Sequence, residues 1–328
     1  MNAEFPTTLQ EAIRYFADEE RAFEFMKNVR WPDGVVRCPQ CDGTEISFIS
    51  TRKLWTCKSC KVRKQFTIKI GTVIEDSPIG YDKWICAFWM IANAKNGISS
   101  YEIGRALGVT QKTGWFLLHR IRLALQNGTI VKVGGQVEVD ETYIGGRARM
   151  MNNKTRAKRN VTTSSKHLTP VQGVLERSKD GKKASRVILT QMPTAGKTTL
   201  DPNVRKYVLR GSIVNTDEAN AYEDIDDEYV REVINHAKCY AHGKVHINGL
   251  ENFWSLLKRT IRGTYVSVEP FHLFRYLDEQ AFRFNERKDE DGDMGRFLKA
   301  IAGMIGKRLT WAKLTGQEGD ADGLPAVC

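Results

Sequence analysis

Three acidic residues that lie in separate segments have the chemistry to act together. Asp140 lies in VEVDETYIGG, Asp217 in SIVNTDEANAY and Glu251 in HINGLENFWSLLKR. If folding brings three carboxylates together, their charge is more than a partly buried site can hold without a cation. Oxygen ligands of this kind suit Mg²⁺ or Mn²⁺ better than zinc. The set therefore predicts a metal site for displacement reactions at phosphorus.

The residues beside these acids predict the elements that carry them. Asp140 and Asp217 end apolar, β-branched runs that are typical of strands. Glu251 opens an amphipathic helix in which, at about 100° per residue, Lys258 and Arg262 follow it along one polar face. A solvated surface helix is the plain alternative for such a face. The neighbouring apolar stripe, which we expect to dock on a sheet, comprises Leu250, Phe253, Leu257 and Ile261.

Two further acids flank Asp140. Strand alternation turns Glu141 to the opposite face, whereas Glu138 shares the face of Asp140. For Glu138 we expect a salt bridge to a nearby Lys or Arg rather than a place among the metal ligands.

Four of the seven cysteines form one pattern, in which two Cys-x2-Cys pairs are separated by 15 residues. This is the spacing of a four-thiolate zinc ribbon that binds Zn²⁺. Two disulfides are the alternative, which a reducing cytosol disfavours, and a redox motif would not explain the second pair. A second zinc site at His236, Cys239, His242 and His246 is disfavoured because these residues straddle a predicted strand end and loop. The predicted ribbon ligands are Cys38, Cys41, Cys57 and Cys60.

The charge of the chain indicates an anionic partner. Lys and Arg number 50 against 39 Asp and Glu, which gives a net charge of +11 and a pI of about 9.3. An excess of this size favours DNA as partner and says nothing about fold. No stretch has the length of a membrane-spanning helix, and residues 1–20 resemble an amphipathic helix rather than a signal peptide. We therefore expect a cytoplasmic, nucleoid-associated protein.

Residues 99–128 have a helix-turn-helix pattern. Ser99 or Ser100 is the expected cap of the first helix, residues 107–109 the turn, and Thr110 the cap of the second helix. Gln111 and Lys112 at the start of the second helix would then contact DNA bases. A structural hairpin that never touches DNA is the alternative. Just upstream, Ser77 is the expected cap of another helix.

From about residue 131 the pattern changes to three strands followed by alternating strands and helices. This order predicts a mixed sheet covered by helices, and the RNase H-like fold is the familiar architecture with that order. The fold class is thus multidomain α/β, with a zinc ribbon and a helix-turn-helix before the sheet. The expected divisions are 1–30 (helical), 31–70 (ribbon), 71–130 (helix-turn-helix), 131–288 (catalytic, with a basic loop at 147–168) and 289–328 (tail).

With these motifs in this order, the chain resembles DDE-type transposases of bacterial insertion sequences, in the group with an N-terminal zinc ribbon. The resemblance implies that Asp140, Asp217 and Glu251 are the catalytic, metal-binding triad, and that Lys258 contacts DNA. Arg259 and Arg262, on the same helix, are expected to contact DNA beside it. The residues that carry the resemblance lie at 71–84, 139–146, 215–222, 246–259 and 271–287.

The resemblance also implies an activity. Such an enzyme binds the ends of its element, cleaves a strand and joins the freed 3′-hydroxyl to target DNA, using two metal ions and no covalent intermediate. A homodimer in a synaptic complex is expected because two ends are handled together. Two alternatives are a catalytically silent DNA-binding regulator and an RNase H-like nuclease that cuts without joining.

Overall fold

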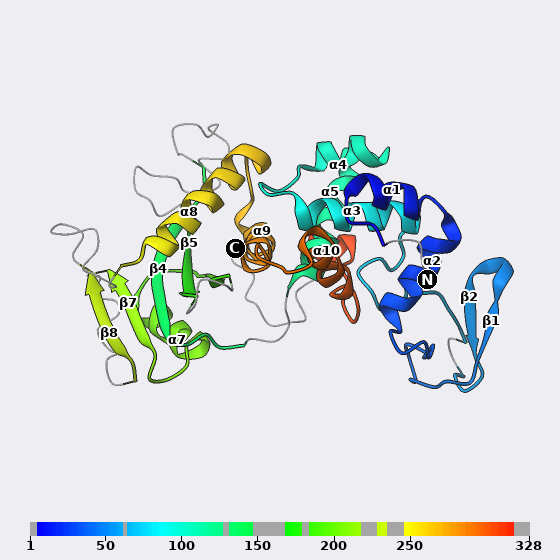
Figure 1. The fold of residues 1–328 in the computed structure, drawn as a ribbon, viewed down its shortest axis with the longest axis horizontal. Coiled ribbons are helices and arrows are strands. Elements are labelled where there is room, and N and C mark those ends of the chain that lie inside the picture. The colour runs from blue at the N-terminus through cyan, green and yellow to red at the C-terminus, as the bar shows by residue number, and fades with distance from the viewer. Residues whose placement is uncertain are drawn as a thin grey trace. The chain divides into compact units, whose positions relative to one another are not determined.

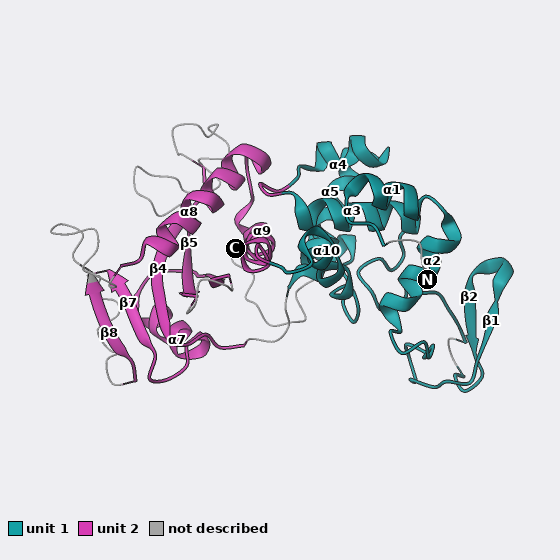
Figure 2. Ribbon diagram, viewed as in Figure 1, with its two compact units in different colours: residues 1–94, 98–127, 289–328 teal, residues 95–97, 128–288 magenta. Residues whose placement is uncertain are grey.

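The computed structural model describes residues 5–61, 64–126, 131–146, 168–178, 184–217, 228–234 and 246–317. The chain divides into two compact units (Figure 2). Unit 1 comprises residues 1–94, 98–127 and 289–328, and unit 2 comprises residues 95–97 and 128–288. Among the described residues, no helix is both long enough and apolar enough to cross a membrane.

Unit 1 begins with two capped helices, α1 (Leu9–Phe16) and α2 (Glu19–Arg30). Thr8 and Glu11 form a capping box at the start of α1, and the Asp18 side chain accepts a hydrogen bond from the Arg21 N–H at the start of α2. These caps satisfy N–H groups that have no partner within a helix. Short-range sequence therefore fixes where both helices begin.

The ribbon is a small antiparallel sheet of β1 (Ile46–Ile49), β2 (Leu54–Cys57) and β3 (Gln65–Phe66), with a 3₁₀ turn at Ser50–Arg52. Trp55 of β2 is its central side chain. Its ring stacks on Phe66 of β3 and on Phe23 of α2, at centroid distances of 5.9 and 5.7 Å. The aromatic residues of the ribbon therefore build a small core that continues onto α2.

Three helices follow: α3 (Tyr81–Asn93), α4 (Ser100–Leu107) and α5 (Gln111–Leu125). The expected cap of α3 was wrong. The helix begins at Tyr81, after Gly80, and the Ser77 hydroxyl accepts a hydrogen bond from the Trp84 indole N–H instead. The Ser77 hydroxyl also accepts from the Ile79 backbone N–H, which forms a local turn ahead of the helix.

The helix-turn-helix formed by α4 and α5 is confirmed as a local structure. Ser99 caps α4 in a capping box with Glu102, Gly108 turns the chain at φ 61°, and Thr110 caps α5. The two helices approach closely at Gly114, where an added Cβ would lie 2.8 Å from the Ser100 carbonyl oxygen.

The C-terminal residues complete unit 1. They form α10 (Gly292–Ala302) and the short α11 (Trp311–Leu314). Phe297 of α10 is fully buried, where it stacks on Phe25 of α2 and contacts Trp89 of α3. The Lys307 ammonium donates to the Leu123, Ala124 and Gln126 carbonyls at the end of α5. Residues 289–317, treated as part of a tail in the sequence, are thus part of this core.

Unit 2 is built on a five-stranded mixed sheet (Figure 1). Its strands are β4 (Gln136–Ile144), β5 (Thr169–Glu176), β6 (Arg186–Gln191), β7 (Ile213–Asp217) and β8 (Val230–Ile234), in the order β6-β5-β4-β7-β8. β4, β5 and β6 pair antiparallel, whereas β4, β7 and β8 pair parallel. The two acid-bearing strands, β4 and β7, are therefore neighbours at the centre of the sheet.

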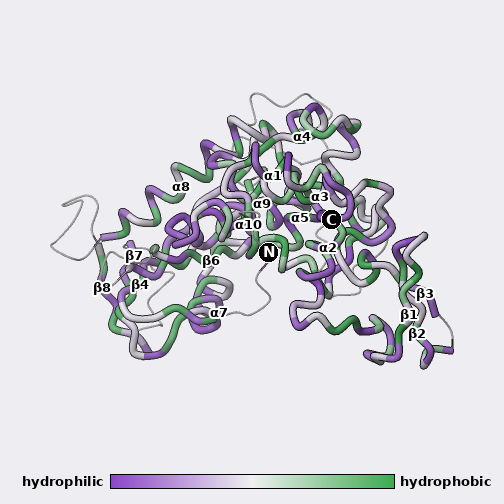
Figure 3. The backbone as a smooth tube through the Cα atoms, turned by 45° about the vertical axis from the view of Figure 1, so that its right-hand side comes forward, coloured by the Kyte–Doolittle hydropathy of each residue, from purple (hydrophilic) through white to green (hydrophobic). Residues whose placement is uncertain are grey.

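Helices cover both faces of the sheet. Val137 and Val139 of β4 pack with α7 (Lys197–Tyr207) on one face. The alternate residues of β4 face α8 (Asn248–Thr260) and α9 (Pro270–Asn285), and the apolar stripe of α8 is buried there as predicted. Figure 3 shows the alternation of hydrophobic and hydrophilic residues along α8. The fold class, an RNase H-like mixed sheet flanked by helices after a zinc ribbon, is confirmed.

Candidate functional site

The four ribbon cysteines are clustered closely enough to hold one metal ion. All four sulfurs lie within 4.8 Å of one another, with Cys38 Sγ 3.5 Å from Cys60 Sγ and Cys41 Sγ 3.6 Å from Cys57 Sγ. A disulfide bond is about 2.0 Å long, whereas zinc at about 2.3 Å from each ligand separates its sulfurs by about 3.8 Å. The spacing fits Zn²⁺, and all four cysteines are free thiols.

The pKa values of the clustered thiols also favour a bound cation. Burial opposes ionisation of Cys38, but N–H groups of Gln40 and Cys41 outweigh it and lower the thiol pKa to about 7. At Cys60, interactions with the Cys41 and Cys38 sulfurs raise the pKa to about 12. The pKa values of Cys38 and of Cys41 and Cys60 are thus shifted in opposite directions, and a bound Zn²⁺ would favour the thiolate form of the raised pair.

The sheet and α8 bring the three predicted acids to one end of unit 2. Parallel pairing of β4 with β7 aligns Glu138 with Asn215, and Asp140 and Asp217 each lie two residues further along their strands. Glu251 lies in the first turn of α8. The charges of Asp217 and Glu251 both act on the Asp140 carboxylate. The side chain of Glu251 is exposed, and those of the two aspartates are half-buried.

The pKa of the Asp140 carboxyl is well above its ordinary value. Burial, together with the charges of Asp217 and Glu251, raises its pKa to about 6, although the Trp254 indole and a backbone N–H oppose the rise. Trp254 Nε1 donates to Asp140 Oδ2 at 2.9 Å. A nearby cation would stabilise the ionised form of a carboxyl whose pKa is raised in this way.

The approach of Trp254 depends on Gly173 of β5, which pairs directly with Asp140. A Cβ at Gly173 would lie 2.7 Å from the Trp254 ring and 2.9 Å from a Leu250 methyl group. The absence of a side chain at Gly173 therefore lets α8 settle close enough for the indole to reach the acid. Sequence reasoning missed both residues, and nothing in their local pattern signals the contact.

The donor set fits a hard divalent cation. Carboxylate oxygens from two strands and a helix are ligands that Mg²⁺ prefers. Among the described residues, however, the cysteine cluster is the group whose ligand atoms already lie within 4.8 Å of one another. The carboxylates interact electrostatically but are not gathered as tightly.

The predicted DNA contacts of α8 occupy different structural settings. Lys258 lies in its last turn, seven residues after Glu251, and Arg259 beside it is exposed. The helix becomes a π-helix at Ile261–Tyr265, so the regular α-helical spacing that placed Arg262 on the face of Glu251 ends before it. Arg262 is exposed on this wider turn. Single π-turns of this kind occur frequently at functional sites.

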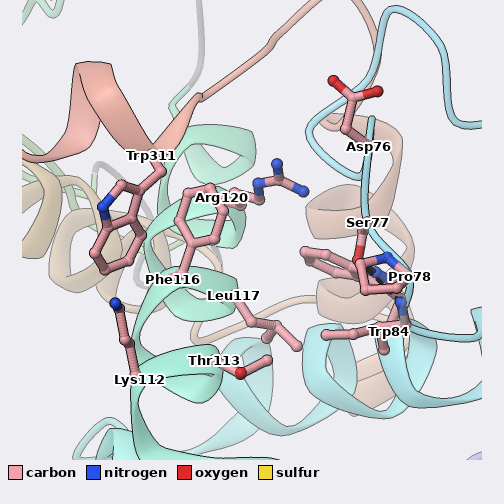
Figure 4. A pocket seen from close by; sticks show the side chains of 11 residues that line it. Asp76, Ser77, Pro78, Trp84, Lys112, Thr113, Phe116, Leu117, Arg120 and Trp311 are labelled. Carbon is pink, nitrogen blue, oxygen red and sulfur yellow. Dashed lines mark hydrogen bonds between the residues drawn. The ribbon is translucent and has the colours of Figure 1, made fainter.

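The predicted base-contacting residues of α5 are exposed but have partners within unit 1. Gln111 Nε2 donates to Ser100 Oγ at 2.8 Å, and the Lys112 ammonium lies 4.5 Å from the centre of the Trp311 ring. Figure 4 shows Lys112 pointing towards Trp311 of α11. Phe116, beside Arg120, also packs on this ring, next to a cavity of about 260 Å³. The helix is therefore supported by the C-terminal segment.

Some sequence predictions lie outside the described residues. These are nearly all of the basic loop at 147–168 and the candidate second-zinc residues His236, Cys239 and His242. His246, the fourth of that set, is described and lies beside Arg177, with its Nδ1 2.9 Å from the guanidinium.

Fold and sites together define a class of protein: a zinc-ribbon and helix-turn-helix unit joined to an RNase H-like unit with three converging acids. Residues 132–285 match the family model of the ISXO2-like transposase domain, and residues 17–63 match that of the transposase zinc-ribbon domain. The chain belongs to this family of insertion-sequence transposases.

Two relatives agree with this assignment. Over 259 residues the chain is 28% identical to an uncharacterized protein in transposable element ISH50 of Halobacterium salinarum. The match covers 75% of this chain and 84% of that protein. Over 101 residues it is 34% identical to an uncharacterized transposase-like protein of Haemophilus influenzae. This match covers 30% of this chain and 81% of that protein.

Proposed function

We propose that this chain is an active DNA transposase that binds the ends of its element, cleaves them and transfers the freed strand to target DNA. The observation that carries the proposal is the convergence of Asp217 and Glu251 on Asp140, whose pKa is raised to about 6. A carboxyl whose pKa is strongly shifted by burial and by nearby charges is a mark of catalytic sites, and the family match supports the reaction class. The synaptic homodimer and a cytoplasmic, nucleoid-associated location belong to the same proposal.

Asp140, Asp217 and Glu251 would hold Mg²⁺ or Mn²⁺. A metal held by these residues would supply activation of the attacking oxygen and neutralisation of charge at the scissile phosphate. The protein positions the phosphodiester in line with the attacking hydroxyl. Trp254 orients the Asp140 carboxylate through its indole N–H. Lys258, on the helix that carries Glu251, would contact a phosphate of the bound strand.

DNA binding is assigned to unit 1 and to the polar face of α8. The ribbon segment 30–69 holds nine Lys or Arg against three acids, a balance that suits contacts to phosphates. Gln111 and Lys112 of α5 would contact bases, with α5 entering the major groove. Arg259 and Arg262 would extend the phosphate contacts of Lys258.

The test is a strand-transfer assay with Mg²⁺, the purified full chain and a labelled DNA end taken from the flanks of its gene. We expect joined products with the wild-type protein and none with Glu251→Gln or Asp140→Asn. Glu141→Gln is the matched control, because Glu141 follows Asp140 directly and faces the other side of β4. DNA binding, measured by fluorescence anisotropy, should be nearly unchanged in all three variants.

Each other outcome assigns a different function. Cleavage without joining would identify a nuclease, and DNA binding without either reaction would identify a silent regulator. Equal loss of cleavage and binding in Asp140→Asn would contradict the catalytic role of Asp140.

A further inference from the structure

Glu138 is a buried acid whose two oxygens have separate partners. Its side chain is 1% exposed and shares the face of Asp140, two residues further along β4. Oε1 accepts from Arg177 Nε at 2.6 Å, and Oε2 accepts from the Leu250 backbone N–H at 2.8 Å. The expected salt bridge is therefore present, and it is joined by a bond to the helix that carries Glu251.

The bond to Leu250 caps the N-terminus of α8 from the sheet. Asn248 begins the helix after Ile247, and no side chain next to it in sequence supplies the cap. N–H groups in a first helical turn need an acceptor, and a negative charge there is also favoured by the helix dipole. The cap has little room, because a Cβ at Gly249 would lie 2.8 Å from Glu138 Oε2. Gly249 therefore allows the carboxylate to reach the helix.

Arg177 ties the same carboxylate to the segment that leads into α8. It follows β5 directly, and its backbone N–H bonds to the Gln136 carbonyl of β4. Its guanidinium donates to the His246 carbonyl oxygen and lies 2.9 Å from His246 Nδ1. His246 Nδ1 is also 3.5 Å from Glu138 Oε1. Two strands and the entry to α8 thus meet at one buried ion pair.

We propose that the Glu138–Arg177 pair is a positioning device that sets Glu251 against Asp140. Glu138 and Asp140 are two residues apart on one strand, and Leu250 and Glu251 are neighbours on one helix. The bond from Glu138 to Leu250 therefore fixes the spacing of the two acids directly. This inference rests on the proposed function and assigns Glu138 a role distinct from metal ligation, since both of its oxygens are already engaged.

An ion pair of this kind fixes the positions of its partners more than it stabilises the fold. Its desolvation cost offsets much of its attraction, whereas removal of one partner leaves an uncompensated charge. The double variant Glu138→Gln/Arg177→Met removes both charges, and we expect it to regain the stability that Glu138→Gln loses. It should not regain activity, because the charged cap on α8 and the tie to His246 are still missing.

The experiment compares the wild type, Glu138→Gln, the double variant and Glu141→Gln as control, all as full-length zinc-loaded protein. In Glu138→Gln we expect strand transfer to fall about 10- to 100-fold and the Mg²⁺ concentration for half-maximal activity to rise, as for partners that orient metal ligands. DNA affinity should change less than about twofold, since phosphate contacts dominate it. Hydrogen exchange of the peptide spanning residues 246–254 should become faster in Glu138→Gln and not in Glu141→Gln.

The outcomes separate the two proposals. Unchanged exchange in Glu138→Gln would overturn the positioning role whether or not the wild type is active. Activity that returns with stability in the double variant would also overturn it, because the pair would then be merely structural. An inactive wild-type protein whose Glu138→Gln variant still exchanges faster would remove the proposed function and leave the tie between the sheet and α8 supported.

Discussion

The cysteine cluster of the ribbon and the proposed acidic site are organised in opposite ways. The zinc ligands come from one short stretch, residues 38–60, and their sulfurs already lie within 4.8 Å of one another. The acids come from residues 140, 217 and 251 and influence one another electrostatically without being gathered so closely. A local site is preorganised by its own turns, whereas a site assembled from distant segments depends on sheet register and helix docking.

The two regions also carry charge differently. Backbone N–H groups lower the pKa of Cys38, so thiolate forms within the ribbon itself. Burial and the other two acids raise the pKa of Asp140, so charge there is disfavoured until a cation arrives. The clustered thiols of the ribbon therefore favour a bound Zn²⁺, and we propose that the acidic site needs a cation to keep Asp140 ionised.

The largest expected effect is at the ribbon. Cys57→Ser should abolish zinc binding, because the sulfur is fully buried and structural zinc contributes on the order of 10 kcal/mol to the folding of small domains. Zinc content measured by mass spectrometry should fall by one ion per chain. Cys86→Ser, outside the cluster, is the control and should keep the ion. If Cys57→Ser retained zinc, the proposal that the ribbon cysteines form a local, preorganised zinc site would be contradicted.

The next effect tests assembly of the acidic site. Gly173→Ala should destabilise the protein by about 1 to 3 kcal/mol, because its methyl group would lie 2.7 Å from the Trp254 ring. Urea unfolding followed by tryptophan fluorescence measures the loss. Gly263→Ala meets nothing within 4 Å and is the control. Equal stability of Gly173→Ala and the wild type would show that α8 docks more loosely than the structure indicates.

Asp140→Asn should stabilise the magnesium-free protein by roughly 1 to 3 kcal/mol, because it removes a carboxylate whose ionisation is disfavoured. The folded pKa of Asp140 is about 6 against an ordinary 3.8, so its favourable contribution is complete below pH 4 and is lost as the pH rises through 6. Urea unfolding between pH 5 and 8 in zinc-containing, magnesium-free buffer tests this. A wild-type minus variant difference that is independent of pH would contradict it.

The smallest effect concerns α5. Lys112→Met should cost less than about 1 kcal/mol of stability, the scale of an exposed cation–π contact with Trp311. If Lys112 also contacts a phosphate, the slope of log affinity against log salt concentration should become shallower by about 1. Lys95→Met is a charge-matched control. An unchanged slope would assign Lys112 to packing against Trp311 alone.

Much of the molecule follows from residues that are close together in sequence. The spacing of Cys38, Cys41, Cys57 and Cys60 predicts the ribbon, and the Ser99 and Thr110 caps predict both helices of the helix-turn-helix. The failure at α3 has the same origin, because Ser77 has the features of a cap but its hydroxyl accepts from Trp84. A local pattern predicts an element well and its first residue less well, since competing contacts decide the end.

The sequence by itself determined the four clustered thiols and the amphipathic helix that carries Glu251, and it predicted the three acids that we propose carry the chemistry. Only the tertiary structure decided how they are held. Glu138 caps α8, Trp254 reaches Asp140 over Gly173, and α10 closes the core against α3. The reason is physical: caps and ligand spacings depend on neighbouring residues, whereas helix docking and ion-pair burial depend on contacts between segments far apart in the chain.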